Sequence, residues 1–198
     1  MHPAFSVLIF TVTSGAGYGL LAWLGGGELL GYTKAYDTNL QVILGVVAMV
    51  LVTIGLFSST MHLANPKNAW RSFSRFRTSW LSREAVFAIL VYPVAALYAA
   101  SIIWQWPLIS IFAGLSMALA LITLFTTSMI YASLKTIRQW NTPMVPALFM
   151  AYALMSGGVL FVAISAFFGM FNKSLLVVAM ARIILTLALK MVYFFWQG

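Results

Sequence analysis

The sequence predicts an all-α, polytopic transmembrane helix bundle of about six helices. Two observations support this prediction: 63% of the 198 residues are hydrophobic, and only 7% are charged. A soluble domain carries about 25% charged residues, because its surface must face water. Since this chain lacks them, a lipid bilayer is the solvent that fits it.

Six apolar segments each approach the roughly 20 residues that a helix needs to cross the hydrocarbon core. We assign them to a single transmembrane domain over residues 1–198, with helices over residues 5–24, 40–62, 85–104, 108–134, 144–168 and 174–196. The apolar runs are continuous rather than alternating, which favours helices over a β-barrel. The first run lacks a basic region before it and a small-residue cleavage site, so we expect a retained helix.

Each segment has its own polar features. Gly15 and Gly19 in the first permit close helix approach, either by packing within the chain or by a partner or ligand. The second segment ends at His62, and the third begins directly after Glu84. A short turn, residues 105–107, joins the third and fourth segments. The fifth contains a pair of glycines at 157 and 158, and the sixth contains two cationic residues.

The net charge of +8 comes mainly from the gaps between these segments. The gaps at residues 63–83 and 135–143 together hold seven Lys and Arg, whereas the other three gaps hold two. Because cationic loops stay on the cytoplasmic side, this pattern predicts that both gaps and both termini are cytoplasmic. Membrane topology therefore explains the basic character better than nucleic-acid binding, and we expect no nucleic-acid partner.

His62 and Glu84 flank the long basic gap. Histidine and glutamate can both exchange protons, and a quinone site needs proton donors beside its two carbonyl oxygens. An alternative is that both side chains simply face water, with Glu84 capping the third helix after Ser82.

Two cations lie inside the sixth segment. Arg182 is about 12–13 Å from the start of that helix, and an arginine at this depth is either functional or satisfied by helix carbonyls. Lys190 lies near the cytoplasmic end, where its side chain can reach the interface. The chain has no cysteine and only two histidines, His2 and His62, both near the same face. We therefore expect neither haem nor another metal site in this chain.

Two motifs resemble a known family. One is Thr60-Met61-His62-Leu63-Ala64-Asn65-Pro66, followed by the basic gap and by Ser82-Arg83-Glu84. The other is the opening His2-Pro3-Ala4-Phe5-Ser6-Val7, with Ser14-Gly15-Ala16-Gly17 after it. Both are similar to the membrane anchor subunit of the dimethyl sulfoxide reductase family, and the similarity is clearest over the first three helices.

The resemblance implies that the chain anchors a molybdopterin catalytic subunit and a ferredoxin-like subunit with four iron–sulfur clusters. It also implies binding of ubiquinone or menaquinone without haem. By position, His62 matches the quinone-site histidine of the family and Glu84 its acidic proton relay. Basic residues expected to join the quinone site are Lys67, Arg71 and Arg75. Residues expected to dock the iron–sulfur subunit are Asn65, Pro66, Trp70, Arg77, Trp80 and Arg83.

The sequence departs from the family at Ala64, often Gly, and at Asn68, often Arg, and it predicts six helices where eight are usual. Because the basic gap is predicted to be cytoplasmic, the chain looks more like the anchors of sulfite dehydrogenases of the bacterial inner membrane. We therefore expect electrons to pass from sulfite to quinone. Three alternatives stay open: a quinol-oxidising anchor of the dimethyl sulfoxide reductase type, a small transporter or channel lined by Arg182, the glycines and Pro93, and a purely structural anchor with no quinone contact.

Overall fold

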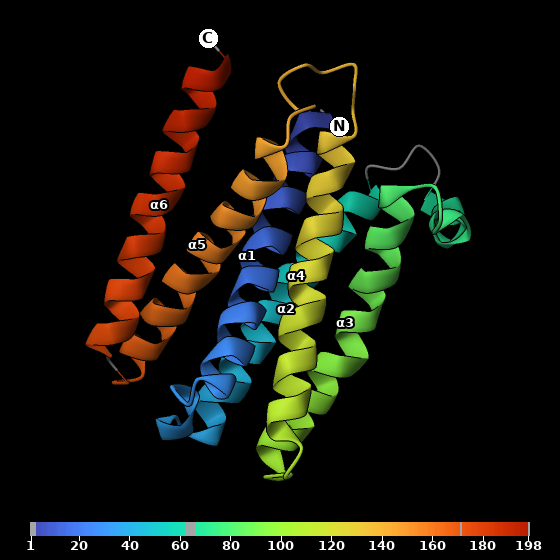
Figure 1. Ribbon diagram of the computed structural model, residues 1–198. Coiled ribbons are helices and arrows are strands. Elements are labelled where there is room, and N and C mark those ends of the chain that lie inside the picture. Colours follow the sequence, from blue (N-terminus) through green and yellow to red (C-terminus); the bar gives the residue numbers. More distant parts are fainter. Residues whose placement is uncertain (1–2, 62–65, 171, 198) are drawn as a thin grey trace.

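The computed structural model describes residues 3–61, 66–170 and 172–197 (Figure 1). In these residues it contains six long helices, each of 24 to 27 residues and each apolar enough to cross a membrane. They are α1 (Pro3–Leu29), α2 (Thr38–Met61), α3 (Trp80–Ile103), α4 (Ile109–Ala132), α5 (Met144–Phe167) and α6 (Lys173–Gln197). Short 3₁₀ helices η1 (Thr33–Ala35) and η2 (Pro66–Arg75) precede α2 and α3. The predicted fold class is confirmed.

The helices run up and down through one bundle, so that alternate connections lie at the same end (Figure 1). The α2–α3 and α4–α5 connections, the start of α1 and the end of α6 all lie at one end, which we call the basic end. The α1–α2, α3–α4 and α5–α6 connections lie at the opposite end. This arrangement places most of the loop cations on a single side of the bundle.

The helix α1 is the centre of the bundle and packs against α2, α4 and α5. It continues five residues beyond the predicted end at residue 24, through Gly25, Gly26 and Gly27. Glycine is a poor helix former, but here a Cβ at position 25 would lie 2.5 Å from the carbonyl oxygen of Ala113. The close approach of α4 therefore requires glycine and stabilises the last turn of α1.

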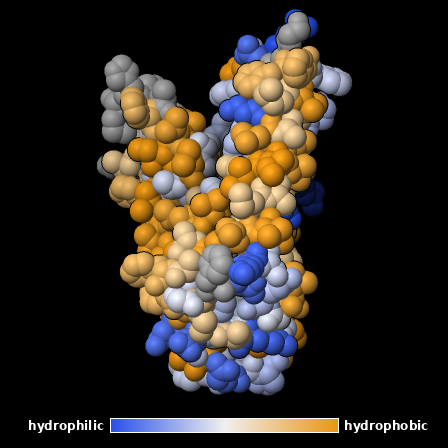
Figure 2. Space-filling view, turned by 90° about the vertical axis from the view of Figure 1, so that its left-hand side faces the viewer, coloured by the Kyte–Doolittle hydropathy of each residue, from blue (hydrophilic) through white to orange (hydrophobic). Residues whose placement is uncertain are grey.

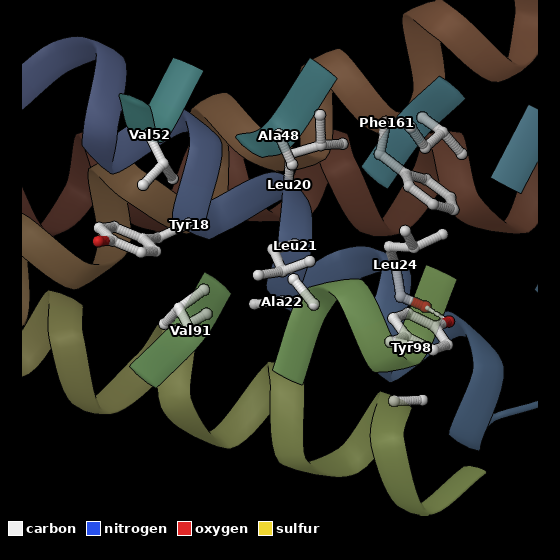
Figure 3. Close-up of a cluster of buried hydrophobic side chains, with 14 of the residues drawn as sticks. Tyr18, Leu20, Leu21, Ala22, Leu24, Ala48, Val52, Val91, Tyr98 and Phe161 are labelled. Carbon is white, nitrogen blue, oxygen red and sulfur yellow. Dashed lines mark hydrogen bonds between the residues drawn. The ribbon is translucent and has the colours of Figure 1, made fainter. Parts of the chain in front are cut away.

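A buried cluster of hydrophobic side chains surrounds α1 (Figure 3). Leu20, Leu21 and Leu24 are at most 1% exposed and pack among residues of α2, α3 and α5. Where α1 crosses α5, a side chain at Gly19 would overlap the backbone of Ala153, and one at Gly157 would overlap the backbone of Gly19. The Gly15–Gly19 pattern thus serves packing within the chain, and Gly19 is the residue at the crossing.

Hydrophobic side chains cover much of the surface in Figure 2, and hydrophilic residues gather at its lower end. The helix α6 is the least enclosed of the six and packs mainly against α5. Apart from Lys173, Ser174, Arg182 and Lys190, its exposed residues are apolar, among them Val177, Ile184 and Phe195. Such an outward face is suited to lipid, because no backbone polar group is left without a partner inside a helix.

Candidate functional site

Glu84 is buried inside the bundle at its basic end. The helix α3 begins at Trp80, five residues earlier than predicted, and Ser79 occupies its N-cap position. Glu84 therefore lies in the second turn, where it points toward α4 and is only 5% exposed. The alternative in which Glu84 faces water and caps the helix is wrong, because the polar residues Ser82 and Arg83 continue the helix rather than precede it.

The carboxyl of Glu84 pairs with a hydroxyl rather than with a cation. Thr127 on α4 donates a hydrogen bond to its Oε1 at 2.9 Å. The same hydroxyl lies 2.9 Å from the carbonyl oxygen of Thr123, and its single proton cannot serve both acceptors fully. If the carboxyl is protonated, it can donate to Thr127 while Thr127 donates to Thr123. The geometry therefore offers Glu84 a partner in either protonation state, as a proton-transfer group requires.

Two tyrosines belong to the helices around this pair. Tyr18 on α1 is buried, and Tyr131 on α4, one turn beyond Thr127, is half-buried. Tyr18 is 1% exposed, and its hydroxyl has no hydrogen-bond partner in the described part of the chain. In Figure 3 this hydroxyl points away from the hydrophobic cluster. The hydroxyl that contacts Glu84 is therefore that of Thr127, and Tyr18 adds a buried hydroxyl without a partner to the interior of the bundle.

Arg83 holds the α2–α3 connection, which we call the basic loop, against the start of α3. Its Nε donates to the carbonyl oxygen of Phe76 at 3.0 Å, and its Nη2 donates to that of Arg77 at 2.9 Å. The guanidinium also lies 4.1 Å from the centre of the Trp80 ring, which in turn meets Phe125 of α4 edge-on. This set of contacts fixes the loop beside the helix that carries Glu84.

The model of the family "DMSO reductase anchor subunit (DmsC)" matches residues 1–197 of the chain. The chain belongs to this anchor family. The match covers all six helices, including the last three, where the sequence motifs were weaker.

Two curated proteins are similar to this chain. A sulfite dehydrogenase subunit of Allochromatium vinosum is 34% identical, over 85% of this chain and 57% of that protein. Anaerobic dimethyl sulfoxide reductase chain YnfH of Escherichia coli is 29% identical, over 58% of this chain and 41% of that protein. The chain spans about half the length of these curated relatives. No solved structure matches it.

The structure locates some of the predicted site residues of the anchor. Arg75 and Arg77 are exposed on the loop, and neither forms an ion pair with Glu84. Trp70 is also exposed, and Trp80 is half-buried at the start of α3. His62 and Asn65 lie outside the described residues, and so do the side chains of Pro66, Lys67 and Arg71. Their roles in quinone binding and docking stay predictions.

Sequence reasoning missed the α4 side of this site. Thr127, which contacts Glu84, lies within a predicted membrane span. Thr126, Thr127 and Ser128 are all at most 3% exposed. Three consecutive hydroxyl residues in an apolar run were the available signal, because a polar group in a membrane needs a partner.

A second buried carboxyl, that of Glu28, lies at the opposite end of the anchor. It was predicted in a loop but belongs to the last turns of α1 and is 5% exposed. Thr33 donates to its Oε2 at 2.7 Å, and the amide of Gln41 donates to the carbonyl oxygens of Thr33 and Tyr36 at 3.1 Å. These bonds close the α1–α2 connection, so we assign this cluster a structural role.

Arg182 lies on α6 and is exposed. It borders an apolar cavity of about 310 Å³ between α1, α4, α5 and α6, together with Trp23, Tyr32 and Met117. No acidic residue pairs with it in the described ranges. The structure therefore does not bring Arg182 together with Glu84, and its role stays a prediction.

Proposed function

We propose that this chain is the membrane anchor and quinone-reactive subunit of a molybdenum oxidoreductase. Its partners would be a molybdopterin catalytic subunit and a ferredoxin-like subunit with four iron–sulfur clusters. The observation that supports this most strongly is the buried Glu84–Thr127 pair at the basic end of a chain that belongs to the anchor family. A carboxyl with a partner in both protonation states fits a step that moves protons to or from a quinone.

The reaction defines what the chain must supply. Sulfite, water and quinone would give sulfate and quinol, so that sulfite loses two electrons and the quinone gains two electrons and two protons. The electrons come from the iron–sulfur subunit, and this chain supplies the binding site and the protons. In our proposal Glu84 passes a proton toward the quinone, and His62 donates a hydrogen bond to one quinone carbonyl.

The choice of sulfite rests on the relatives and on the charge pattern. The relative that matches 85% of this chain is a sulfite dehydrogenase subunit. The cations of the α2–α3 and α4–α5 loops favour a cytoplasmic position for the basic end in the bacterial inner membrane, with the N-terminus on the same side. A catalytic subunit docked there would oxidise sulfite in the cytoplasm.

The loop at the basic end is suited to docking a partner. Trp70, Phe73 and Phe76 are exposed beside the exposed cations Arg75 and Arg77. Aromatic and arginine side chains are the types enriched at the centres of protein interfaces. We propose that this surface, with Asn65, Pro66, Trp80 and Arg83, binds the iron–sulfur subunit and brings its nearest cluster toward the quinone. The basic residues Lys67, Arg71 and Arg75 would join the quinone site.

A second candidate function has the opposite direction of electron transfer, from quinol to the catalytic subunit. An anchor of the dimethyl sulfoxide reductase type would oxidise quinol, and the similarity to chain YnfH favours it. The same Glu84 would then accept a proton. The transporter hypothesis has no comparable support, because the family match extends over all six helices.

The test is to purify the native complex through this chain and to assay metals, polypeptides and two activities. Copurified molybdenum, iron and two larger subunits are expected, together with sulfite-dependent reduction of a short-chain quinone. Glu84→Gln and His62→Ala should lower quinone turnover on the order of 100-fold, while sulfite-dependent dye reduction persists. Unchanged quinone turnover in both variants would reject the assigned site, and a lone chain without metals would reject the proposed function.

A further inference from the structure

A pocket with aromatic walls opens at the basic end between α4, α5 and α6. The helices α5 and α6 meet at the opposite end and diverge toward the basic end (Figure 1). The pocket has a volume of about 350 Å³, and its wall includes Tyr131, Trp140, Phe149, Tyr152, Lys190 and Tyr193. This volume lies within the range of sites that hold small molecules.

The walls of this aromatic pocket are held in place by contacts of their own. The rings of Tyr131 and Phe149 stack with their centres 6.1 Å apart, and Trp140 meets Tyr131 edge-on at 5.3 Å. The hydroxyl of Tyr193 donates to the carbonyl oxygen of Gln139 at 2.8 Å, which ties α6 to the α4–α5 loop. The pocket therefore presents fixed, flat faces that suit a flat ring.

Lys190 supplies a cation to the pocket wall. Its Nζ lies 5.6 Å from the centre of the Tyr152 ring and 5.9 Å from that of Phe194, and no carboxylate pairs with it in the described residues. An ammonium held over an aromatic ring in a largely apolar pocket can donate to a ligand oxygen. The reach of Lys190 thus fits a carbonyl on the edge of a bound ring.

An apolar groove continues from the pocket into the membrane. This tail groove has a volume of about 270 Å³ and shares Thr11, Phe149 and Tyr152 with the aromatic pocket. From there it follows α1 and α5 past Gly15, Ala153 and Met155. A ligand that fills both spaces has a flat polar head and a long apolar tail.

The aromatic pocket also touches the surroundings of Glu84. Tyr131 forms part of the pocket wall and lies on α4 one turn beyond Thr127, the residue that donates to Glu84. We propose that the quinone ring binds in the aromatic pocket, that Lys190 donates a hydrogen bond to one ring carbonyl, and that the isoprenoid tail lies in the tail groove. This inference rests on the proposed function and adds the ring-binding residues to it.

The experiment compares Lys190→Met with Lys135→Met in the complex with its partner subunits. Lys135 is exposed in the α4–α5 loop and does not line the pocket, so its loss is a matched control for charge. For Lys190→Met we expect the KM for a short-chain quinone to rise about 10-fold, as loss of a charge-assisted hydrogen bond predicts. Lys190→Arg should restore much of the affinity, and dye-linked activity should stay at the wild-type level in all three variants.

A photoreactive azidoquinone gives a second readout. It should label peptides that contain Tyr131 or Tyr152, and excess quinone should compete with the label. If Lys190→Met retains the wild-type KM and the label lies elsewhere, while Glu84→Gln still abolishes quinone turnover, the ring pocket is refuted and the proposed function stands. If Lys190→Met instead loses only a copurified anionic phospholipid, the pocket is a lipid site and the inference is wrong. If the wild-type complex reduces dye but never quinone, the proposed function itself fails.

Discussion

The hydroxyl of Thr127 on α4 lies 2.9 Å from the carboxyl of Glu84 on α3, and the two residues are 5% exposed or less. This bond joins neighbouring helices through a group that can gain or lose a proton. A change in the protonation of Glu84 therefore alters the hydrogen bonding of both helices.

Thr127→Val should separate the role of this hydroxyl from that of helix packing. The substitution preserves the shape of the side chain but removes the donor to Glu84, so we expect quinone turnover to fall several-fold and stability to fall by about 0.5–1.5 kcal/mol. Thr126→Val is the matched control, because Thr126 donates to carbonyls of its own helix rather than to Glu84. Equal quinone rates in the two variants would show that Thr127 does not support Glu84.

Gly19→Ala and Gly15→Ala should differ sharply in their effect on folding. A Cβ at Gly19 would overlap the carbonyl group of Ala153, whereas one at Gly15 would meet the Cβ of Ala153 at an ordinary 3.8 Å. We expect Gly19→Ala to cost about 1–3 kcal/mol or more and Gly15→Ala to be nearly neutral. Thermal unfolding in detergent measures both. A Gly15→Ala variant as unstable as Gly19→Ala would contradict the crossing described above.

Arg83→Lys should loosen the basic loop while the charge is kept. Lysine cannot reproduce the two bonds to the carbonyls of Phe76 and Arg77 together with the stacking on Trp80. We expect chymotrypsin to cleave after Phe73 or Phe76 up to about 10-fold faster. Arg75→Lys, whose side chain is exposed, serves as the control. Equal cleavage rates would show that Arg83 does not hold the loop.

Glu28→Gln should leave quinone turnover unchanged. Glu28 belongs to the cluster that closes the α1–α2 connection. The fully buried apolar residues Leu21 and Leu24 lie on α1 between Glu28 and Tyr18. A glutamine oxygen can still accept the bond from Thr33, so stability should fall by about 1 kcal/mol or less. Sulfite-dependent quinone reduction is the assay. A large loss of rate would indicate that protons reach the quinone from the opposite end.

The absence of cysteine makes the topology directly measurable. Single cysteines at Lys34 and Arg77 should react with a membrane-impermeant maleimide from opposite sides of the membrane. Both residues are exposed and belong to connections at opposite ends of the bundle. In intact cells we expect labelling at position 34 and protection at position 77. The reverse pattern would place the basic end outside and would contradict oxidation of sulfite in the cytoplasm.

The sequence allowed prediction of the six spans, because apolar length alone distinguishes a membrane helix. It misplaced the end of α1 and the start of α3 for one reason. Hydropathy drops at Gly25 and at Ser82-Arg83-Glu84, so the apolar runs end there. The backbone nevertheless stays helical at both places, because packing against α4 stabilises these helix ends. The pattern of apolar and polar residues also does not specify which helix faces pack against one another. For this reason Glu84 was found from its position, whereas Thr127 and Tyr131 required the structure.

The crossing of α1 and α5 also has a consequence for how the chain is made. Gly19 enters the bilayer with the first helix, but its packing partners Ala153 and Gly157 are synthesised more than 100 residues later. At about 5–20 residues per second, that interval is on the order of ten seconds. During this time the glycine face of α1 and the indole of Trp23, which donates to Leu154, have no α5 to contact. Until then α1 can pack only against α2 and α4, so the contact between α1 and α5 is completed late in synthesis.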